Sequence, residues 1–457
     1  MQNGETFRIL PCIIVTMAHP SHVELLTSGR WNAWRKENPV IVPDLSSIHL
    51  KDVKLGNVDL THANLAGTTL ENCEMKGAVL QGCQTTGLTL VQVDLTDALL
   101  DTLDLSTAKR ISGLILHGAR LTRVSLAGLA LEGCDFTNAI LKEVNFGSVS
   151  SSDFVLNRTQ LESCDFRQAR LARSQWNEVQ AHQVDLSDTD LAEITMINSS
   201  LDACRTTGIK APEHTLRNCR IISASLAGCN LTGAIWSGVK LGKVTISDSI
   251  LNGIRFVGME LNEIRIEKSQ LNRAGFEDTS LEGASFLECE MEELKLSGKD
   301  IKSVTFARCE MSGSTFSQAK LANVILRSCT LKGVSMAGMT ARMVDAAGGK
   351  WTEACLSRSR WDRSSLLKGS FLKCEADGVL FNACDLSQTQ WERSKLQGAK
   401  FPHADLTGAR FRQTFLNSCN FETATLKKTR FTRSFLRKAV FPSPFLWKIK
   451  LLVTRFF

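Results

Sequence analysis

The sequence predicts an all-β chain folded as a four-sided parallel β-helix of about 20 coils. Three observations predict this class: a five-residue period of large apolar residues, small residues two positions earlier, and cysteines confined to that second position. A period of five matches neither the 3.6 of a helix nor the 2 of a strand. It fits a chain that turns a corner every five residues, so that four sides close one coil.

The period is nearly continuous. A large apolar residue occupies nearly every fifth position, which we name the centre, from Leu45 to Leu105. One residue is inserted near Lys109, and the period then runs from Ile111 to Phe441. Of 80 centre positions, 72 hold Leu, Ile, Met, Phe or Trp, so we expect the repeats to cover roughly residues 43–441.

A small or β-branched residue stands two places before most centres, at the minus-two position. The segments Ala63–Gly67 and Ala404–Gly408 read Ala-Asn-Leu-Ala-Gly and Ala-Asp-Leu-Thr-Gly. This pattern resembles the pentapeptide-repeat family, whose consensus is Ala-(Asp/Asn)-Leu-x-x. The resemblance implies a right-handed quadrilateral β-helix with centre and minus-two side chains inside the coil.

Cysteine placement supports this arrangement. Thirteen of the 15 cysteines are at minus-two positions: Cys73, Cys83, Cys134, Cys164, Cys204, Cys219, Cys229, Cys289, Cys309, Cys329, Cys374, Cys384 and Cys419. Since a free cysteine packs like a small hydrophobe, we expect inward thiols and neither disulfides nor a metal site. A reducing, cytoplasmic compartment follows as an expectation. Cys355 is expected to point outward.

Aromatic centres separated by multiples of 20 should stack on one side of the coil. The aromatic columns change sides near residue 345, beside a stretch of small residues at 337–350. We therefore predict two sub-solenoids, 43–336 and 351–441, joined by an irregular coil or bend at 337–350. A second irregular coil is expected near Pro212.

Both ends of a solenoid need caps. Residues 1–42 form an amino-terminal segment in which Ser21–Glu24 fits a capping box before a helical cap. The apolar run 7–15 lacks the basic start of a secretory signal, and we expect a capping strand or sequence upstream of a start at Met17. Residues 442–457 form a basic, apolar tail, in which Ser443 and Pro444 suit a helix start.

Chemistry-bearing motifs are missing from the sequence. The eight histidines are scattered, without metal-ligand spacing to cysteines or carboxylates. Neither a phosphate-binding glycine loop nor a nucleophile elbow occurs. We predict that the chain is not an enzyme and has no cofactor, no metal and no small-molecule substrate.

Charge is unevenly distributed. Residues 391–457 carry 14 Lys and Arg against three acidic residues, within a chain of net charge +7. An acidic patch, the acidic collar, comprises Glu277, Asp278, Glu282, Glu288, Glu290, Glu292 and Glu293. A candidate interaction surface, the basic end, comprises Phe415, Phe435, Arg412, Lys427, Lys428, Arg430, Arg433, Arg437, Lys438, Trp447, Lys448 and Lys450.

The tail leaves three alternatives open. It caps the solenoid by folding onto Phe415 and Phe435, mediates homodimerisation through the carboxyl-terminal end, or lies on an anionic membrane as a basic amphipathic segment. Capping or self-association is the preferred interpretation.

The function favoured by the sequence is a non-catalytic, protein-binding scaffold or adaptor of bacterial origin. Some relatives resemble secreted effectors or components of secretion machines, so an association with a secretion system is one hypothesis. A second function comes from relatives that resemble duplex DNA and bind DNA gyrase. Because such mimics need an acidic surface, the basic balance of this chain disfavours it. A third is peripheral binding of membrane or nucleic acid through the basic end.

Overall fold

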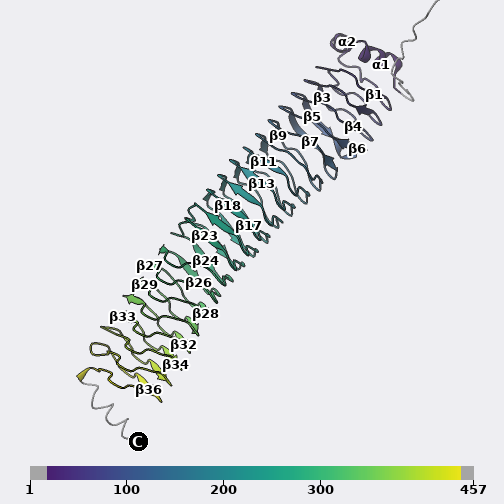
Figure 1. The fold of residues 1–457 in the computed structure, drawn as a ribbon. Helices are drawn as coiled ribbons and strands as arrows, with labels where there is room; N and C mark the ends of the chain where they lie inside the picture. Colours follow the sequence, from purple (N-terminus) through teal and green to yellow (C-terminus); the bar gives the residue numbers. More distant parts are fainter. Residues whose placement is uncertain (1–17, 444–457) are drawn as a thin grey trace, which may run out of the picture. The chain divides into compact units, whose positions relative to one another are not determined.

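A computed structural model describes residues 18–443 of the chain. These residues belong to two compact units, divided between Ala224 and Ser225, which we name unit 1 and unit 2. Each unit is a right-handed parallel β-helix, and the two together hold about 19 turns. Figure 1 shows the short strands of each unit stacked coil upon coil. Among the described residues, no helix is long and apolar enough to cross a membrane.

The coils repeat with the spacing that the sequence predicts. In unit 1 Trp176 pairs with Met196, and in unit 2 Phe256 pairs with Phe276, both in parallel register. Many corners are tight turns. At one of them, the backbone N–H of Ala63 donates to the carbonyl of Leu60 at 2.9 Å. The residue before Ala63, His62, has a φ of 58°. A positive φ at the third position is what a type II turn requires, and the chain turns a corner there.

Unit 1 begins with two helices, α1 (Pro20–Thr27) and α2 (Trp31–Glu37). The strands of its first side are β1 (His49–Lys51), β2 (Thr69–Glu71), β4 (Thr89–Val91), β6 (Arg110–Ser112) and β8 (Leu131–Glu132). A second side holds β3 (Val79–Gln81), β5 (Leu99–Asp104), β7 (Arg120–Ser125), β9 (Ile140–Lys142), β10 (Gln160–Glu162), β12 (Gln180–His182), β14 (Ser200–Asp202) and β16 (Arg220–Ile222). A third holds β11 (Gln175–Asn177), β13 (Thr195–Ile197) and β15 (Thr215–Arg217).

Unit 2 has the same four-sided plan. One side holds β18 (Ile235–Ser237), β21 (Arg255–Val257) and β23 (Gly275–Glu277). The next begins with β19 (Lys240–Gly242) and later holds β25 (Asp300–Lys302), β27 (Lys320–Ala322), β29 (Thr340–Arg342), β31 (Arg360–Asp362) and β33 (Leu380–Asn382). A third holds β17 (Ser225–Ala227), β20 (Thr245–Ser247), β22 (Arg265–Glu267), β24 (Ser285–Leu287) and β26 (Thr305–Ala307). The fourth holds β28 (Thr330–Lys332), β30 (Lys350–Thr352), β32 (Ser370–Leu372), β34 (Gln390–Glu392), β35 (Arg410–Arg412) and β36 (Arg430–Thr432).

The inserted residue after Leu105 lengthens one coil of unit 1. Strand β4 pairs Thr89 with Arg110, an offset of 21, whereas the next pair on that side, Ile111 with Leu131, has the usual offset of 20. A 3₁₀ turn, η1 (Leu105–Thr107), absorbs the extra residue at a corner. The carboxylate of Asp104 accepts from the backbone N–H of Ser106 at 3.1 Å and fixes the start of that turn.

The core is a set of side-chain columns running from coil to coil. Aromatic centres that are in register stack as predicted, with ring centroids 5.2 Å apart for Phe286–Phe306 and 5.5 Å for Trp351–Phe371. The minus-two cysteines named above are all buried, and none of them forms a disulfide within the described residues. Most of their thiols donate to carbonyls of the preceding coil, as Cys309 does to Phe286 at 3.3 Å.

The amino-terminal cap differs in detail from the prediction. Helix α1 begins at Pro20 with His19 at its N-cap, so Ser21 does not act as the N-cap of a capping box. Proline occupies the first helical position because its missing N–H is not needed there. Helix α2 is anchored to the first coils by its side chains, since Trp31 Nε1 donates to the carbonyl of Asp59 at 2.7 Å.

Residues 337–350 form a regular coil, which corrects the predicted irregularity. Thr340–Arg342 pairs with Lys320–Ala322 on one side and with Arg360–Asp362 on the other, both at an offset of 20. The backbone ladder holds the register there although the centres Ala341 and Ala346 are small. The proposed boundaries of the two sub-solenoids stay predictions. The stretch near Pro212 keeps the five-residue phase, and there the backbone N–H of Lys210 donates to the carbonyl of Thr189 at 2.9 Å.

Candidate interaction surfaces

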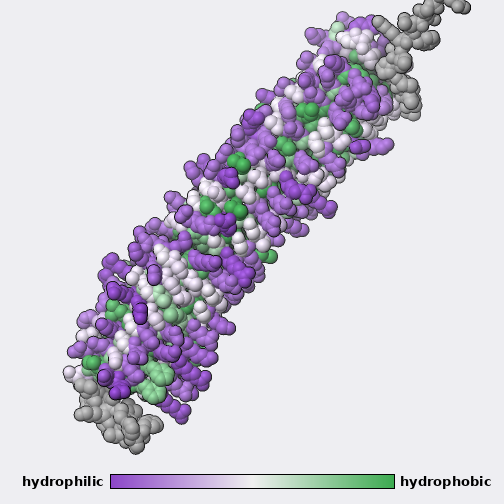
Figure 2. Space-filling model, viewed as in Figure 1, coloured by the Kyte–Doolittle hydropathy of each residue, from purple (hydrophilic) through white to green (hydrophobic). Residues whose placement is uncertain are grey.

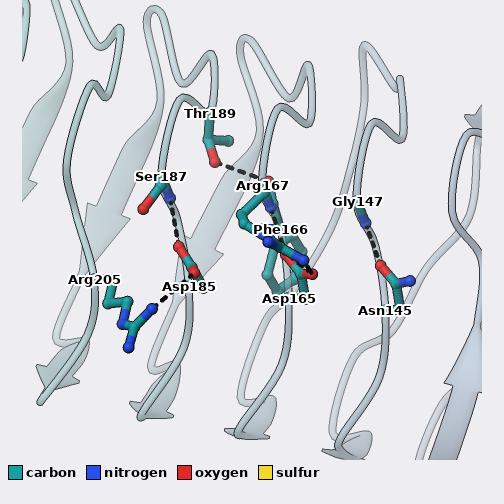
Figure 3. A network of polar contacts seen from close by, with 9 residues as sticks. All are labelled: Asn145, Gly147, Asp165, Phe166, Arg167, Asp185, Ser187, Thr189 and Arg205. Carbon is teal, nitrogen blue, oxygen red and sulfur yellow. Dashed lines mark hydrogen bonds and ion pairs between the residues drawn. The ribbon is translucent and has the colours of Figure 1, made fainter.

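Most outward side chains are polar, and Figure 2 shows small apolar areas scattered among hydrophilic ones on the visible face. Many outward Asp and Asn residues are used by the backbone. In unit 1 the side-chain oxygens of Asn145, Asp165 and Asp185 accept from the N–H two residues later at 2.8, 2.9 and 3.0 Å. Figure 3 shows these turns repeated from coil to coil. This contact explains the Asp or Asn of the repeat, since it satisfies a backbone donor at the corner.

Asp165 and Asp185 also form ion pairs with arginines. Asp165 lies 2.6 Å from the guanidinium of Arg167, and Asp185 lies 3.9 Å from that of Arg205. Partial burial disfavours ionisation of Asp165, but hydrogen bonds from Arg167 outweigh it and lower the pKa of the carboxyl. These charges therefore serve the repeat itself, and they are not free to bind a partner.

The described members of the basic end surround the last coils of unit 2. Phe415 and Phe435 lie on one side, with Arg437 and Lys438 next to them in the chain. The adjoining side carries Arg412, at the end of β35, and Arg430, at the start of β36, with Arg433 at the corner that follows. Lys427 and Lys428 lie on the side before that one. Trp447, Lys448 and Lys450 lie outside the described residues.

Phe415 and Phe435 form an outer aromatic pair. Their ring centroids are 4.9 Å apart with an interplanar angle of 8°. Their exposed fractions are 43% and 57%, which are among the highest of the large apolar residues described. The pair occupies the position directly before a centre, where the side chain points away from the core.

The cations of the basic end have few anionic neighbours. Within residues 18–443, only one of them has a carboxylate within 4 Å: Arg412 Nη1 lies 4.0 Å from Glu392. The others are exposed and have no such partner in the described part of the chain: Lys427, Lys428, Arg430, Arg433, Arg437 and Lys438. A surface of uncompensated cations attracts anionic partners through its summed field.

The acidic collar is distributed around one coil. Glu277 and Asp278 lie on one side, Glu282 on the next, and Glu288 on the third. The fourth side carries the remaining three: Glu290, Glu292 and Glu293. All seven residues are exposed, and together they encircle the coil without forming a single face.

Three members of the collar are neutralised by arginines of neighbouring coils. The shortest N–O distances are 2.6 Å for Arg255–Glu277, 2.9 Å for Arg273–Glu293 and 2.7 Å for Arg308–Glu288. These pairs were not predicted from the sequence, although the partners in the last two are 20 positions apart and the register makes them neighbours. The collar is therefore less acidic than its composition indicates.

The buried thiols are not ionised near neutral pH. Burial raises the pKa of Cys83 and of Cys384 to about 12, so each thiol stays protonated near neutral pH. Cys355 is half-buried and faces outward, as the sequence predicts. Among residues 18–443, no group of three or more His, Cys, Asp or Glu side chains could hold a metal ion.

The family model described as pentapeptide repeats matches the chain in eight copies. The matched residues are 44–82, 115–150, 377–413 and 404–441. The chain is a pentapeptide-repeat protein. A search of curated proteins finds no match.

A search of solved structures finds proteins similar to parts of this pentapeptide-repeat protein. HetL, a pentapeptide-repeat protein involved in heterocyst differentiation regulation in the cyanobacterium Nostoc sp. strain PCC 7120, is 21% identical. That alignment covers 59% of this chain and 97% of HetL, with a TM-score of 0.26. A trypsin-treated variant of QnrB1, a plasmid-mediated fluoroquinolone resistance protein, is 20% identical over 44% of this chain and 94% of its own, with a TM-score of 0.22.

Two inward ionisable residues of this pentapeptide-repeat protein were not predicted from its sequence. His214 occupies a minus-two position and is 3% exposed. Lys299 also occupies a minus-two position and is half-buried, and its Nζ donates to the carbonyl of Phe276 at 2.7 Å. Both could have been predicted from the sequence, because each is an ionisable residue at a minus-two position, where the other residues are mostly small or apolar.

Proposed function

We propose that the chain is a non-catalytic scaffold whose basic end binds an acidic surface of a partner protein. The pentapeptide-repeat fold supplies a rigid set of outward positions without needing a catalytic site. The observation that carries the proposal is the outer aromatic pair, Phe415 and Phe435, beside cations that lack carboxylate partners among the described residues.

Aromatic and arginine side chains are the residues most enriched at the energetic centres of protein interfaces. Phe415 and Phe435 present stacked rings that already hold one orientation, so less side-chain entropy is lost on binding. The cations nearest to Phe435 in the chain are Arg433, Arg437 and Lys438. They would form a charged rim around the rings, and the partner would need carboxylates opposite them.

The proposal is tested by affinity purification from the source cells, using the full chain and the double substitution Phe415→Ser with Phe435→Ser. A partner identified with the wild-type chain is then produced and its Kd measured against both proteins. We expect the double substitution to weaken that Kd at least tenfold, since buried aromatic anchors contribute about 2 kcal/mol or more each.

The matched control is Ile250→Ser with Met343→Ser, which removes two outward apolar side chains that are 41% and 54% exposed elsewhere in unit 2. This control should bind like the wild type. Binding should also weaken as salt rises, because the rim cations are exposed and screened. Equal affinity of the Phe double variant and the control would overturn the proposal.

The other functions expected from the sequence stay predictions. Gyrase modulation by DNA mimicry is disfavoured by the Arg–Glu pairs of the acidic collar, and inhibition in a supercoiling assay at submicromolar protein would revive it. Membrane or nucleic-acid binding and homodimerisation depend on a tail that lies outside the described residues. A bacterial origin, a secretion association and a cytoplasmic, reducing location are proposals too. The last is supported by the buried thiols, which form no disulfide among the described residues.

A further inference from the structure

The backbone ladder of unit 2 is interrupted at one place on the side that holds β21 and β23. Strand β23 is the last of its sheet. The next residue in register, Lys295, bridges onward to Thr315. In the described part of the chain, no backbone hydrogen bond joins residues 274–278 to residues 294–298. Two successive coils therefore separate there, although the five-residue phase of the sequence continues.

Lys299 occupies this opening. It is the only charged residue at a minus-two position of residues 225–443, where the other occupants are uncharged. One coil earlier, Thr279 fills the same slot, and its hydroxyl donates to the carbonyl of Phe256 at 2.9 Å. Lys299 Nζ makes the equivalent bond to Phe276 at 2.7 Å. An ammonium has three donors, so two remain after this contact.

A cavity of about 720 Å³ lies over the opening. Four cations line it, Arg255, Arg273, Lys295 and Lys299, against two carboxylates, Glu277 and Glu293.

The two arginines are paired with the two glutamates, as described above. Lys295 and Lys299 form no ion pair within 4 Å in the described residues, and with four cations against two carboxylates the lining carries two more positive than negative charges.

Part of the cavity lining is backbone that carries no side chain. Gly275 lies there, and a Cβ added to it would meet only ordinary contacts, the nearest being Arg255 Cγ at 3.6 Å. The backbone N–H of Lys295 has no backbone acceptor among the described residues, since its ladder partner is lost at the interruption. The lining therefore includes two lysines and a residue whose backbone N–H has no backbone acceptor, and such donors suit an oxyanion.

We propose that this cavity is a binding site for a phosphate group, held by Lys299 and Lys295 and by the N–H of Lys295. Phosphate offers several acceptor oxygens and up to two negative charges, which match the available donors and the two excess positive charges. The site binds its ligand without transforming it, and it is independent of the basic end.

The experiment titrates the full chain with inorganic phosphate and, separately, with glycerol 3-phosphate, by isothermal calorimetry at low salt. The two arms distinguish a free ion from a phosphomonoester. We compare the wild type with Lys299→Thr, which removes the charge but keeps a donor for Phe276, as Thr279 does for Phe256. We expect Lys299→Thr to weaken binding about tenfold or more, as for loss of one charge-assisted hydrogen bond.

The control is Lys302→Thr, the same change in charge on an exposed lysine outside the cavity. It should bind within twofold of the wild type. Gly275→Val adds a side chain to the lining without changing charge, and should weaken binding as well. Unchanged circular dichroism shows that each variant is folded. Saturable binding that is equal in the wild type and Lys299→Thr, or no saturable binding by the wild type to either probe, would overturn the proposal.

Discussion

Two aromatic stacks of unit 2 share one geometry and differ in where they point. Phe371 and Trp391 are inward centres with ring centroids 3.8 Å apart and planes 4° apart. Phe415 and Phe435 are outward, with centroids 4.9 Å apart and planes 8° apart. The inner rings are at most 1% exposed, whereas the outer rings are 43% and 57% exposed. Stacking thus follows from the coil-to-coil register alone, and burial decides whether a stack stabilises the fold or is available to a partner.

The largest change in the free energy of unfolding is expected at Trp391, in the inner stack. Trp391→Ala should lower the free energy of unfolding by about 3–5 kcal/mol, because a buried aromatic ring leaves a cavity that its neighbours fill only in part. Urea unfolding of the full chain, followed by far-ultraviolet circular dichroism, measures the loss. Trp391→Phe should lose less, and it remains measurable if the alanine variant does not fold. A loss under about 1 kcal/mol for the alanine variant would contradict the conclusion that the buried stack stabilises the fold.

The stability of unit 1 should depend on pH through His214, which lies at an inward minus-two position. Burial lowers the pKa of His214 to about 4, and a hydrogen bond with the carbonyl of Ala211 opposes this only in part. Between pH 6.5 and 4 the unfolded chain binds the proton that the folded chain refuses, so stability falls as the pH falls. At pH 5 the loss relative to pH 7 should be about 2 kcal/mol.

The control for this effect is His214→Val, since valine occupies similar slots such as Val179 and Val184. Its urea midpoint should change less between pH 7 and pH 5 than that of the wild type. Carboxylates are the same in both proteins, so their contribution cancels when the two pH dependences are compared. The pKa of Asp165, for example, is held below its ordinary 3.8, so its contribution is lost as the pH falls through and below that value in either protein. The same pH dependence in both proteins would refute a role for His214.

The smallest effect on stability is expected at the outer stack. Phe415→Ser with Phe435→Ser should change the free energy of unfolding by only about 0.5 kcal/mol, the usual range for surface positions. The same urea titration measures it. A loss approaching that of Trp391→Ala would show that the outer rings serve the fold, and would remove the basis for assigning them to a partner.

The sequence predicts the inward positions well because they recur at a fixed spacing. Cys309, for example, is predicted to lie in the core from its place before Met311, and it is buried. The separation of coils at Lys295 was not predictable from the period, because the centres Phe276 and Leu296 keep their phase across it. Ladder interruptions depend on how each corner turns, and a hydrophobic period does not record that.

Predictions about outward residues depend on neighbours one coil away. The acidic collar is defined by residues close in sequence, whereas Glu288 is neutralised by Arg308, one coil later. Reading the sequence in rows of 20 would have shown this pair. It would not have shown Arg255 with Glu277, which lie out of register and meet through the direction of their side chains.

The lengthened coil of unit 1 has a consequence for how such chains change in length. The extra residue is contained by η1, and the coil after it returns to the usual spacing. A corner therefore absorbs an insertion locally, and every later repeat keeps its inward and outward assignment. This corner is therefore a place where a single-residue insertion is accommodated without shifting the later coils. It is equally a site at which a peptide epitope could be grafted without rephasing the repeats that follow.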